Sequence, residues 1–316
     1  YVWVGIFSLA MIAQFWSLAN DMYPEEAGKR LFPVIAIGAV AGASLGSKIA
    51  ALLFDAGVSP YSMMQITVGI LMLHLVLTLA AERRGNVASG KTEAKQQDDA
   101  LKGSNGFALV LRSSYIRLIA LVMVLLNLVN TTGEYILSKT VVQAADAAIA
   151  LDATVDKGAF IGSFYGDFFF YVNIVTLLIQ AFAVSRIVKY LGIKGVLFAL
   201  PLVAFGAYGV IAFGAALGLI RVLKTAENST DYSVMNTAKA LIWLPTSRAE
   251  KYKAKQAVDT FFVRTGDLLS GGLVFVGTVL FQFGIKQFAI ANLFLIALWV
   301  FITYLLWKEY RRISET

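Results

Sequence analysis

Long apolar runs, separated by short polar segments, repeat along the whole chain. A bilayer core about 30 Å thick is crossed by about 20 apolar residues of helix, and a helix satisfies its own backbone hydrogen bonds in lipid. Nine runs have this character, and they lie near 1–19, 31–54, 61–81, 114–131, 160–184, 195–213, 214–238, 258–284 and 287–307. The runs at 214–238 and 258–284 carry charges, and we predict them as spans partly because the helices around them must be connected. The pattern predicts an all-α membrane protein with nine spans.

Basic residues mark one side of these predicted spans. In the short loops of membrane proteins, Lys and Arg gather on the cytoplasmic side. Here they are concentrated in five segments, at 29–30, 82–113, 186–194, 248–255 and 308–316. The segment 132–159 instead carries three aspartates against two lysines, so we predict that it is external. The alternation predicts a cytoplasmic C-terminus.

Composition excludes several other classes of protein. Of the 316 residues, 58% are hydrophobic and 15% are charged, whereas soluble domains are roughly 25% charged. The chain has no Cys and a single His, which excludes a disulfide scaffold, a Cys-ligated zinc site and a multi-His metal centre. The net charge of +7 is divided into short clusters between apolar runs, so it does not predict nucleic-acid binding. No nucleophile stands beside a base, and we expect neither an enzyme nor a cofactor.

One linker-like stretch divides the predicted spans. The segment 82–113 is rich in Gly, Ser, Lys and Gln, and three predicted spans precede it while six follow. If the two halves are equal, the complete architecture has twelve spans and three are missing from this chain. We therefore expect the following parts: three spans of the N-terminal half at 1–81, a cytoplasmic linker at 82–113, a six-span C-terminal half at 114–307 and a cytoplasmic tail at 308–316.

A weak internal repeat supports two similar halves. Two motifs recur at matching positions around a basic cytoplasmic turn in each half. They are Ser17-Leu-Ala-Asn20 with Ser233-Val-Met-Asn236, and Ser44 and Gly46 with Ser270 and Gly272. A carrier of six plus six helices, built from two parallel repeats, has this layout.

The run 214–238 holds the densest group of polar residues within a predicted span. Their spacing of three and four residues puts four of them on one helical stripe, with Glu227 beside it, and the four are Arg221, Lys224, Asn228 and Asp231. Ionisable groups in a span are costly, so the stripe must face water or protein rather than lipid. Two interpretations follow. The stripe is either a substrate pathway whose cations hold an anion, or a ladder of groups that neutralise one another.

Further polar residues lie in the neighbouring spans. Glu134 ends a series of polar positions at helical spacing, and Asp167 lies within the run 160–184. In the run 258–284, Arg264 and Asp267 are three residues apart and can pair with each other. Asp259 lies near the cytoplasmic end of that run, where a gating or capping role is expected.

A block of polar motifs resembles the signature of the ATP/ADP translocases of plastids and intracellular bacteria. The block is Glu227-Asn-Ser-Thr-Asp-Tyr-Ser-Val-Met-Asn-Thr-Ala-Lys239, then Leu-Ile-Trp-Leu-Pro245, then Glu250-Lys-Tyr-Lys-Ala-Lys-Gln-Ala-Val-Asp259. Shorter matches are Glu134-Tyr-Ile-Leu-Ser-Lys139 and Tyr165-Gly-Asp167-Phe168. The resemblance implies a twelve-helix carrier related to the major facilitator fold, in a bacterial inner membrane, that exchanges nucleotides. It implies pathway roles for Glu134, Asp167, Lys224, Asp231, Asn236 and Lys239.

The chain departs from that family at one informative position. Characterised exchangers have a Gly-Lys-Ser-Gly-Gly stretch where this chain has Gly266-Asp267-Leu-Leu-Ser-Gly271-Gly272, so an acid replaces a base. We therefore expect a divergent relative from a free-living bacterium.

The leading functional hypothesis is a carrier of a nucleotide or a related phosphorylated anion. Arg221 and Lys224 would neutralise phosphate, and Tyr232 would stack on a base or simply pack against other helices. One alternative is a proton-coupled carrier of an organic anion, lipid or drug, in which Asp231, Asp267 and Glu134 titrate. Another is a membrane sensor or anchor that transports nothing. The expected partners are a small anionic substrate and the lipid bilayer.

Overall fold

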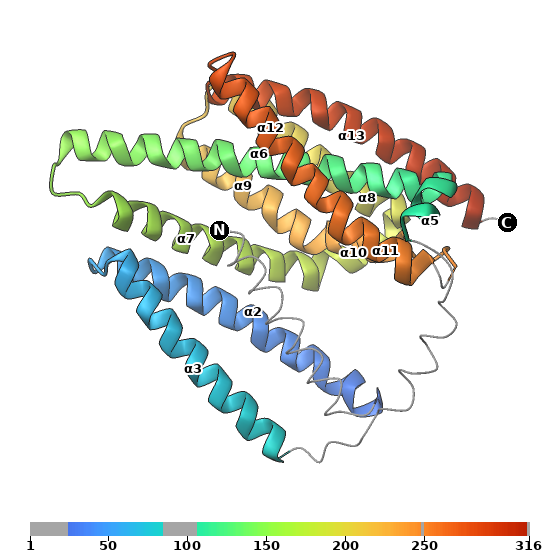
Figure 1. Cartoon of the computed structure of the whole chain (residues 1–316), viewed down its shortest axis with the longest axis horizontal. Helices are drawn as coiled ribbons and strands as arrows, with labels where there is room; N and C mark the ends of the chain where they lie inside the picture. Colours follow the sequence, from blue (N-terminus) through green and yellow to red (C-terminus); the bar gives the residue numbers. More distant parts are fainter. Residues whose placement is uncertain (1–24, 85–105, 248–249, 315–316) are drawn as a thin grey trace.

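The computed structural model describes residues 25–84, 106–247 and 250–314, and every regular element within these ranges is helical (Figure 1). The predicted first span, 1–19, lies outside the described residues, as does the first member of the predicted repeat at 17–20. The longer helices are α2 (Glu25–Asp55), α3 (Pro60–Arg84), α6 (Ser114–Leu151), α7 (Lys157–Leu178), α8 (Ser185–Ala212), α9 (Leu217–Thr230), α12 (Val263–Val279) and α13 (Ile285–Ser314).

Short helices and wide π-helical turns connect these elements. The short helices are α5 (Gly106–Arg112), α10 (Asn236–Leu241) and α11 (Lys255–Ala257), and the π-helical turns are η1 (Ile179–Val184), η2 (Asp231–Met235), η3 (Glu250–Ala254) and η4 (Val258–Phe262). Turn η2 lies between α9 and α10, inside the predicted span with the dense polar group. Such turns inside α-helices are frequent at functional sites.

Helix α6 is the central element of the bundle. It packs chiefly against α12, which crosses it, and α13, and it also contacts α7 and α9 (Figure 1). Helix α8 packs behind α13 and against α9. The hairpin of α2 and α3 joins the rest chiefly through α2, which packs along α7. The α2–α7 seam is therefore the main contact between the segments before and after the predicted linker.

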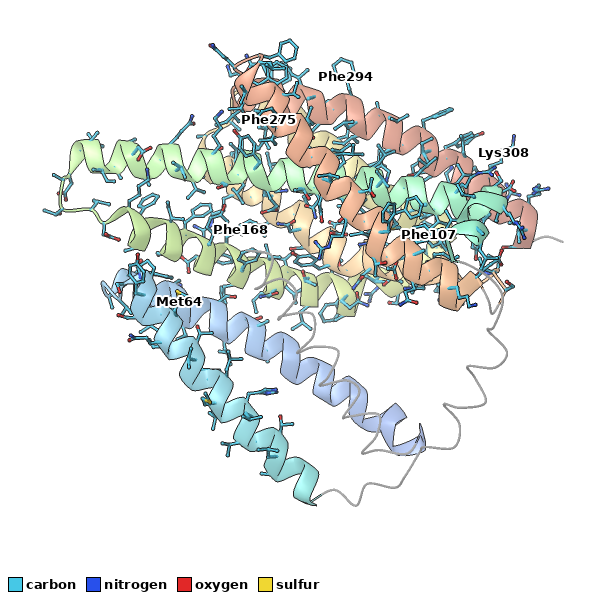
Figure 2. The ribbon with its side chains drawn as sticks, in the orientation of Figure 1. Met64, Phe107, Phe168, Phe275, Phe294 and Lys308 are labelled. Carbon is cyan, nitrogen blue, oxygen red and sulfur yellow. The ribbon has the colours of Figure 1, made fainter. Side chains whose placement is uncertain are left out.

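Much of the outer surface is apolar. Met64 of α3, Phe275 of α12 and Phe294 of α13 all point outward, and each is more than 60% exposed (Figure 2). Phe168 of α7, by contrast, is fully buried. An apolar surface of this extent is unfavourable in water but is solvated by lipid tails.

Five helical segments of the described chain are long and apolar enough to cross a bilayer. They are Pro60–Ala80, Ser114–Leu151, Lys157–Ala212, Lys255–Val279 and Ile285–Ser314. The segment Lys157–Ala212 covers two predicted spans, 160–184 and 195–213. Gly192, with a φ of 62°, interrupts the helix between them. These features are those of an all-α membrane protein. Two further predicted spans lie outside these five segments: 31–54, which is helical within α2, and the charged run 214–238, which is helical from Leu217 onward.

Two elements extend further than the sequence pattern predicts. Helix α6 continues to Leu151, so most of the predicted external segment 132–159 is helical. Its extension keeps apolar residues at helical spacing, and Ile136, Val141 and Ala145 are fully buried against neighbouring helices. Packing therefore prolongs the helix beyond the stretch that hydropathy alone marks. At the other end, Ser113 accepts a hydrogen bond from the backbone of Ile116 and caps α6.

Candidate functional site

The polar stripe of α9 faces the interior of the bundle. Helix α9 is amphipathic, and it carries its polar side chains toward α6, α7 and α8. The buried members of the stripe and the turn that follows are Lys224, Glu227, Asn228 and Asp231. Arg221, one turn before Lys224, is partly buried. The burial of these side chains inside the bundle agrees with the expectation that the stripe does not face lipid.

Lys224 lies at the centre of a buried cluster. Its side chain is 0% exposed, and its Nζ lies 2.9 Å from Oε2 of Glu227 and 3.4 Å from Oε1 of Glu134. Nζ also donates to the hydroxyl of Tyr208 at 3.4 Å, and that hydroxyl donates to Oε1 of Glu227 at 3.1 Å. The cluster thus joins one cation to two carboxylates from α6 and α9. A fully buried charge is tolerated only with such partners.

Gly133 makes room for this cluster. A Cβ at that position would lie 1.8 Å from the Tyr208 hydroxyl oxygen and 2.8 Å from Nζ of Lys224. Neither Gly133 nor Tyr208 was among the predicted site residues. Tyr208 stands in an apolar run without a distinguishing pattern, and only the packing of α8 against α9 brings it to Lys224.

Glu134 is the exposed edge of the cluster. Its side chain is 38% exposed, whereas that of Glu227 is 4% exposed. Asn228 donates to Oε1 of Glu134 at 3.1 Å, so α9 holds this carboxylate through both Lys224 and Asn228. Glu134 is therefore the more exposed of the two carboxylates around Lys224.

A second cluster crosses the seam between α2 and α7. The Nζ of Lys48, on α2, donates to Oδ1 of Asp167, on α7, at 2.7 Å. Arg221 of α9 lies 3.7 Å from the other carboxylate oxygen of Asp167. The guanidinium of Arg221 also lies over the rings of Phe164 and Tyr171, at 5.4 and 5.3 Å from their centroids. Asp167 thus links three helices, and all three charged side chains of this cluster remain partly exposed.

The third cluster is a single ion pair, which lies further along the chain. The Nζ of Lys239 lies 3.3 Å from Oδ1 of Asp231, whose side chain is 9% exposed. A cavity of about 10 Å³ lies beside Asn130, Glu227 and Asp231. That volume is on the order of one water molecule. Tyr232 and Asn236 turn outward from the pair, and Tyr232 is 46% exposed.

The residues predicted to form a gate or an ion pair lie in turn η4 and in helix α12. Asp259 belongs to η4, and Arg264 and Asp267 belong to α12. Arg264 pairs with Asp267 at 3.0 Å, in agreement with their spacing. Asp267 also accepts a hydrogen bond of 2.8 Å from Thr131 of α6, which the sequence did not predict. Asp259 pairs with Lys255 one turn away, and both side chains are exposed. Asp267 therefore connects α12 to α6 in addition to pairing with Arg264.

The three clusters are electrically balanced. Four cations, Lys48, Arg221, Lys224 and Lys239, meet four carboxylates, Glu134, Asp167, Glu227 and Asp231. Each of these cations therefore already lies beside a carboxylate. Among the residues whose placement is described, no group of three His, Asp or Glu side chains suits a metal ion.

The fold and these clusters define a helical membrane protein with a charged interior. Curated relatives agree with this class. ADP,ATP carrier protein 1 of Chlamydia pneumoniae is 23% identical over 95% of this chain and 64% of its own length. The protein of the same name from Chlamydia trachomatis is 24% identical over 84% of this chain and 55% of its own length. ADP,ATP carrier protein 3 of Rickettsia bellii is 24% identical over the whole chain and 70% of its own length.

These similarities support the ATP/ADP translocase family, which the block from Glu227 to Asp259 predicted. The chain spans less than two thirds of the length of the two chlamydial carriers. No family profile matches the sequence, and no solved structure matches it.

Proposed function

We propose that the protein is a secondary membrane carrier that exchanges nucleotides, or a closely related phosphorylated anion, by alternating access. The observation that carries the proposal is the fully buried Lys224, held by Glu227 and Glu134 on helices of a chain related to ADP,ATP carriers. An ionisable cluster inside a membrane bundle is costly, and it is expected where a solute or ion passes. The relatives are carriers, and the proposed activity is transport, not catalysis.

Competition between carboxylates and phosphate provides a mechanism. A phosphate group presents charged oxygens of the kind that Asp167 offers to Lys48 and Arg221. An entering phosphate would replace Asp167 beside Arg221, and further phosphates would meet Lys224 after moving Glu134. Glu134 and Asp167 are the partly exposed acids of the three clusters, so they are the ones that can turn toward water.

The ion pairs also provide a reason for exchange. Lys48 belongs to α2 and Asp167 to α7, so their contact holds the segments before and after the linker together. A carrier locked by this pair when empty would change conformation only after an anion releases it. Binding can shift such an equilibrium only by its differential affinity for the two states, and the released pair supplies that difference. Counter-exchange without net leak is the expected consequence.

We further propose a major-facilitator-like architecture of two six-helix halves. In this chain 1–81 would supply three spans of the first half, 82–113 the linker, 114–307 the second half and 308–316 a cytoplasmic tail. The proposed location is the bacterial inner membrane. A green fluorescent protein fused after Thr316 would fluoresce if the tail is cytoplasmic, and a periplasmic reporter at the same position would be active if it is not.

The exchange test uses the full-length gene product in proteoliposomes. Labelled ATP is expected to enter when ADP or ATP is loaded inside, and uptake should fall to background in Lys224→Ala. Lys286→Ala is the matched control, because Lys286 is an exposed lysine at the N-terminal end of α13, outside the three clusters. Uptake that follows a pH gradient and ignores nucleotides would contradict the proposal and favour the proton-coupled carrier. No flux by folded protein would favour the sensor or anchor.

A further inference from the structure

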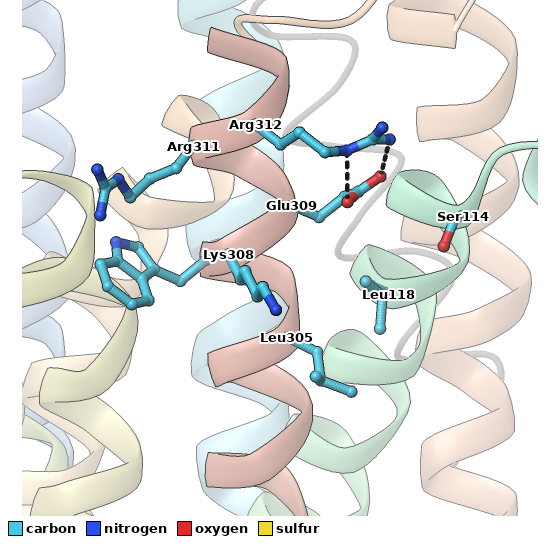
Figure 3. A pocket seen from close by; sticks show the side chains of 8 residues that line it. Ser114, Leu118, Leu305, Lys308, Glu309, Arg311 and Arg312 are labelled. Atoms are coloured by element: carbon cyan, nitrogen blue, oxygen red, sulfur yellow. Dashed lines mark hydrogen bonds and ion pairs between the residues drawn. The ribbon is translucent and has the colours of Figure 1, made fainter. Parts of the chain in front are cut away.

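A second charged region lies away from the three clusters, at the C-terminal end of α13. The apolar run of α13 ends here in Trp307, followed by Lys308, Arg311 and Arg312. The beginning of α6 faces this end of α13, and a cavity of about 590 Å³ opens between them (Figure 3). Binding sites for small ligands commonly have volumes of about 300–1,000 Å³.

The cavity has an apolar part and a basic part. Leu118 of α6 and Leu305 of α13 line the first, while Lys308, Arg311 and Arg312 line the second. Figure 3 shows Lys308 beside Leu305, on the side of α13 that faces Leu118. Ser114, at the start of α6, adds a hydroxyl to the lining. A ligand that fits both parts has an anionic group joined to an apolar one.

The basic residues differ in their availability. Arg312 donates two hydrogen bonds to Glu309, of 3.0 and 2.6 Å, so its charge is already paired with that carboxylate. Arg311 lies over the ring of Trp307, as does Lys194 of α8, at 5.6 and 4.9 Å from the centroid. Lys308 is exposed, and no carboxylate among the described residues pairs with it. Lys308 is therefore the cation best placed to take an external anion.

The position of the cavity indicates where the ligand comes from. Tryptophan and basic side chains at the end of an apolar helix are typical of the membrane–water interface. Basic pockets between spans at that depth bind the headgroups of anionic lipids. We propose that this cavity binds the phosphate-bearing headgroup of an anionic phospholipid, with Lys308 as its principal cation and Leu118 and Leu305 against the first part of the acyl chains. This site is independent of the carrier's substrate.

Binding of single lipids to the purified, delipidated full-length protein tests the proposal by native mass spectrometry. Phosphatidylglycerol is expected to bind more tightly than phosphatidylcholine. Lys308→Gln should weaken phosphatidylglycerol about fivefold, since a basic residue near a lipid surface contributes on that scale, and should leave phosphatidylcholine unchanged. Lys308→Arg keeps the charge and should retain the preference. Lys286→Gln removes the same charge from the opposite end of the same helix and should change neither lipid.

Four results would overturn the assignment. Equal affinity for the two lipids would show that the cavity does not select an anionic headgroup. Unchanged phosphatidylglycerol binding in Lys308→Gln would remove Lys308 from the site, and a loss in both Lys308→Gln and Lys308→Arg would indicate a packing defect instead. Displacement of the lipid by an equal concentration of inorganic phosphate would assign the site to a soluble anion. Thermal unfolding without added lipid controls for folding of each variant.

Discussion

The ammonium of Lys224 lies 2.9 Å from a carboxylate oxygen of Glu227, and both side chains are buried in the middle of the bundle, 0% and 4% exposed. That oxygen, Oε2, is an ion-pair partner but accepts no directed hydrogen bond from the described residues. Lys224 and Glu227 are three residues apart on α9. Glu134 of α6 lies near the ammonium, and Tyr208 of α8 donates a hydrogen bond to Glu227. Its stability therefore depends on three helices at once.

The two members of this pair are predicted to differ in their effect on stability. Lys224→Met leaves Glu227 buried without a cation, and breaking a buried pair in this way costs about 3–5 kcal/mol. Glu227→Gln is expected to cost less, because Glu134 remains 3.4 Å from the ammonium. Unfolding of the purified variants in mixed micelles measures both free energies. Equal losses would mean that Glu134 does not stabilise Lys224.

Asp167→Asn is predicted to loosen the empty state of the proposed carrier. It removes the charge that joins Lys48 of α2 to Arg221 of α9, and a partly exposed pair of this kind contributes about 1 kcal/mol. We therefore expect efflux of preloaded nucleotide into nucleotide-free buffer to rise about fivefold.

Asp146→Asn is the control for that measurement. Asp146 pairs with Lys157 at 2.5 Å between the end of α6 and the start of α7, and both side chains are exposed. Its loss should leave efflux unchanged. A similar rise in both variants would indicate a general weakening of α7.

Gly166→Ala is predicted to open the α2–α7 seam. A Cβ at position 166 would lie 2.7 Å from the backbone nitrogen of Ala51 and 2.8 Å from the carbonyl oxygen of Ser47. Backbone cannot move aside as a flexible side chain does, so we expect a loss of about 1–3 kcal/mol. Gly206→Ala, on α8, meets nothing within 4 Å and should be neutral by the same unfolding measurement. Equal stability of the two variants would contradict this close approach.

The turn between α6 and α7 is predicted to respond to acid through Asp152. Its Oδ1 accepts hydrogen bonds from the backbone nitrogen and the hydroxyl of Thr154, at 2.9 and 2.7 Å. These bonds hold the pKa of Asp152 below its ordinary value of 3.8. Because the folded pKa is the lower one, the stabilisation is present above the unfolded pKa and is lost as pH falls through the folded pKa.

Thr154→Val removes the hydroxyl donor and should raise the pKa of Asp152 toward 3.8. The chemical shift of the Asp152 carboxyl carbon, followed during an acid titration, measures this change. Asp156, which caps α7 through the backbone of Ala159, provides an internal reference. An unchanged titration of Asp152 would mean that its hydrogen bond to the backbone nitrogen is sufficient.

The helices themselves could be predicted from the sequence. A chain in lipid must pair its backbone groups within each segment, so a run of apolar residues becomes a helix whatever its neighbours are. The polar stripe could also be predicted, because Arg221, Lys224, Asn228 and Asp231 lie on one face of any α-helix at their spacing of three and four residues. The Arg264–Asp267 pair was predicted because both residues lie within one turn.

The partners of these residues were decided by tertiary packing. Glu134 and Asn228 are 94 positions apart, and Lys48 and Asp167 are 119 apart, so no local spacing brings them together. The contact of Tyr208 with Lys224 and the space left by Gly133 depend on how α6, α8 and α9 cross. Helix α6 likewise continues to Leu151 because neighbouring helices bury its extension. Helix formation in a membrane is a local requirement, whereas the choice among apolar faces depends on shape complementarity over the whole bundle.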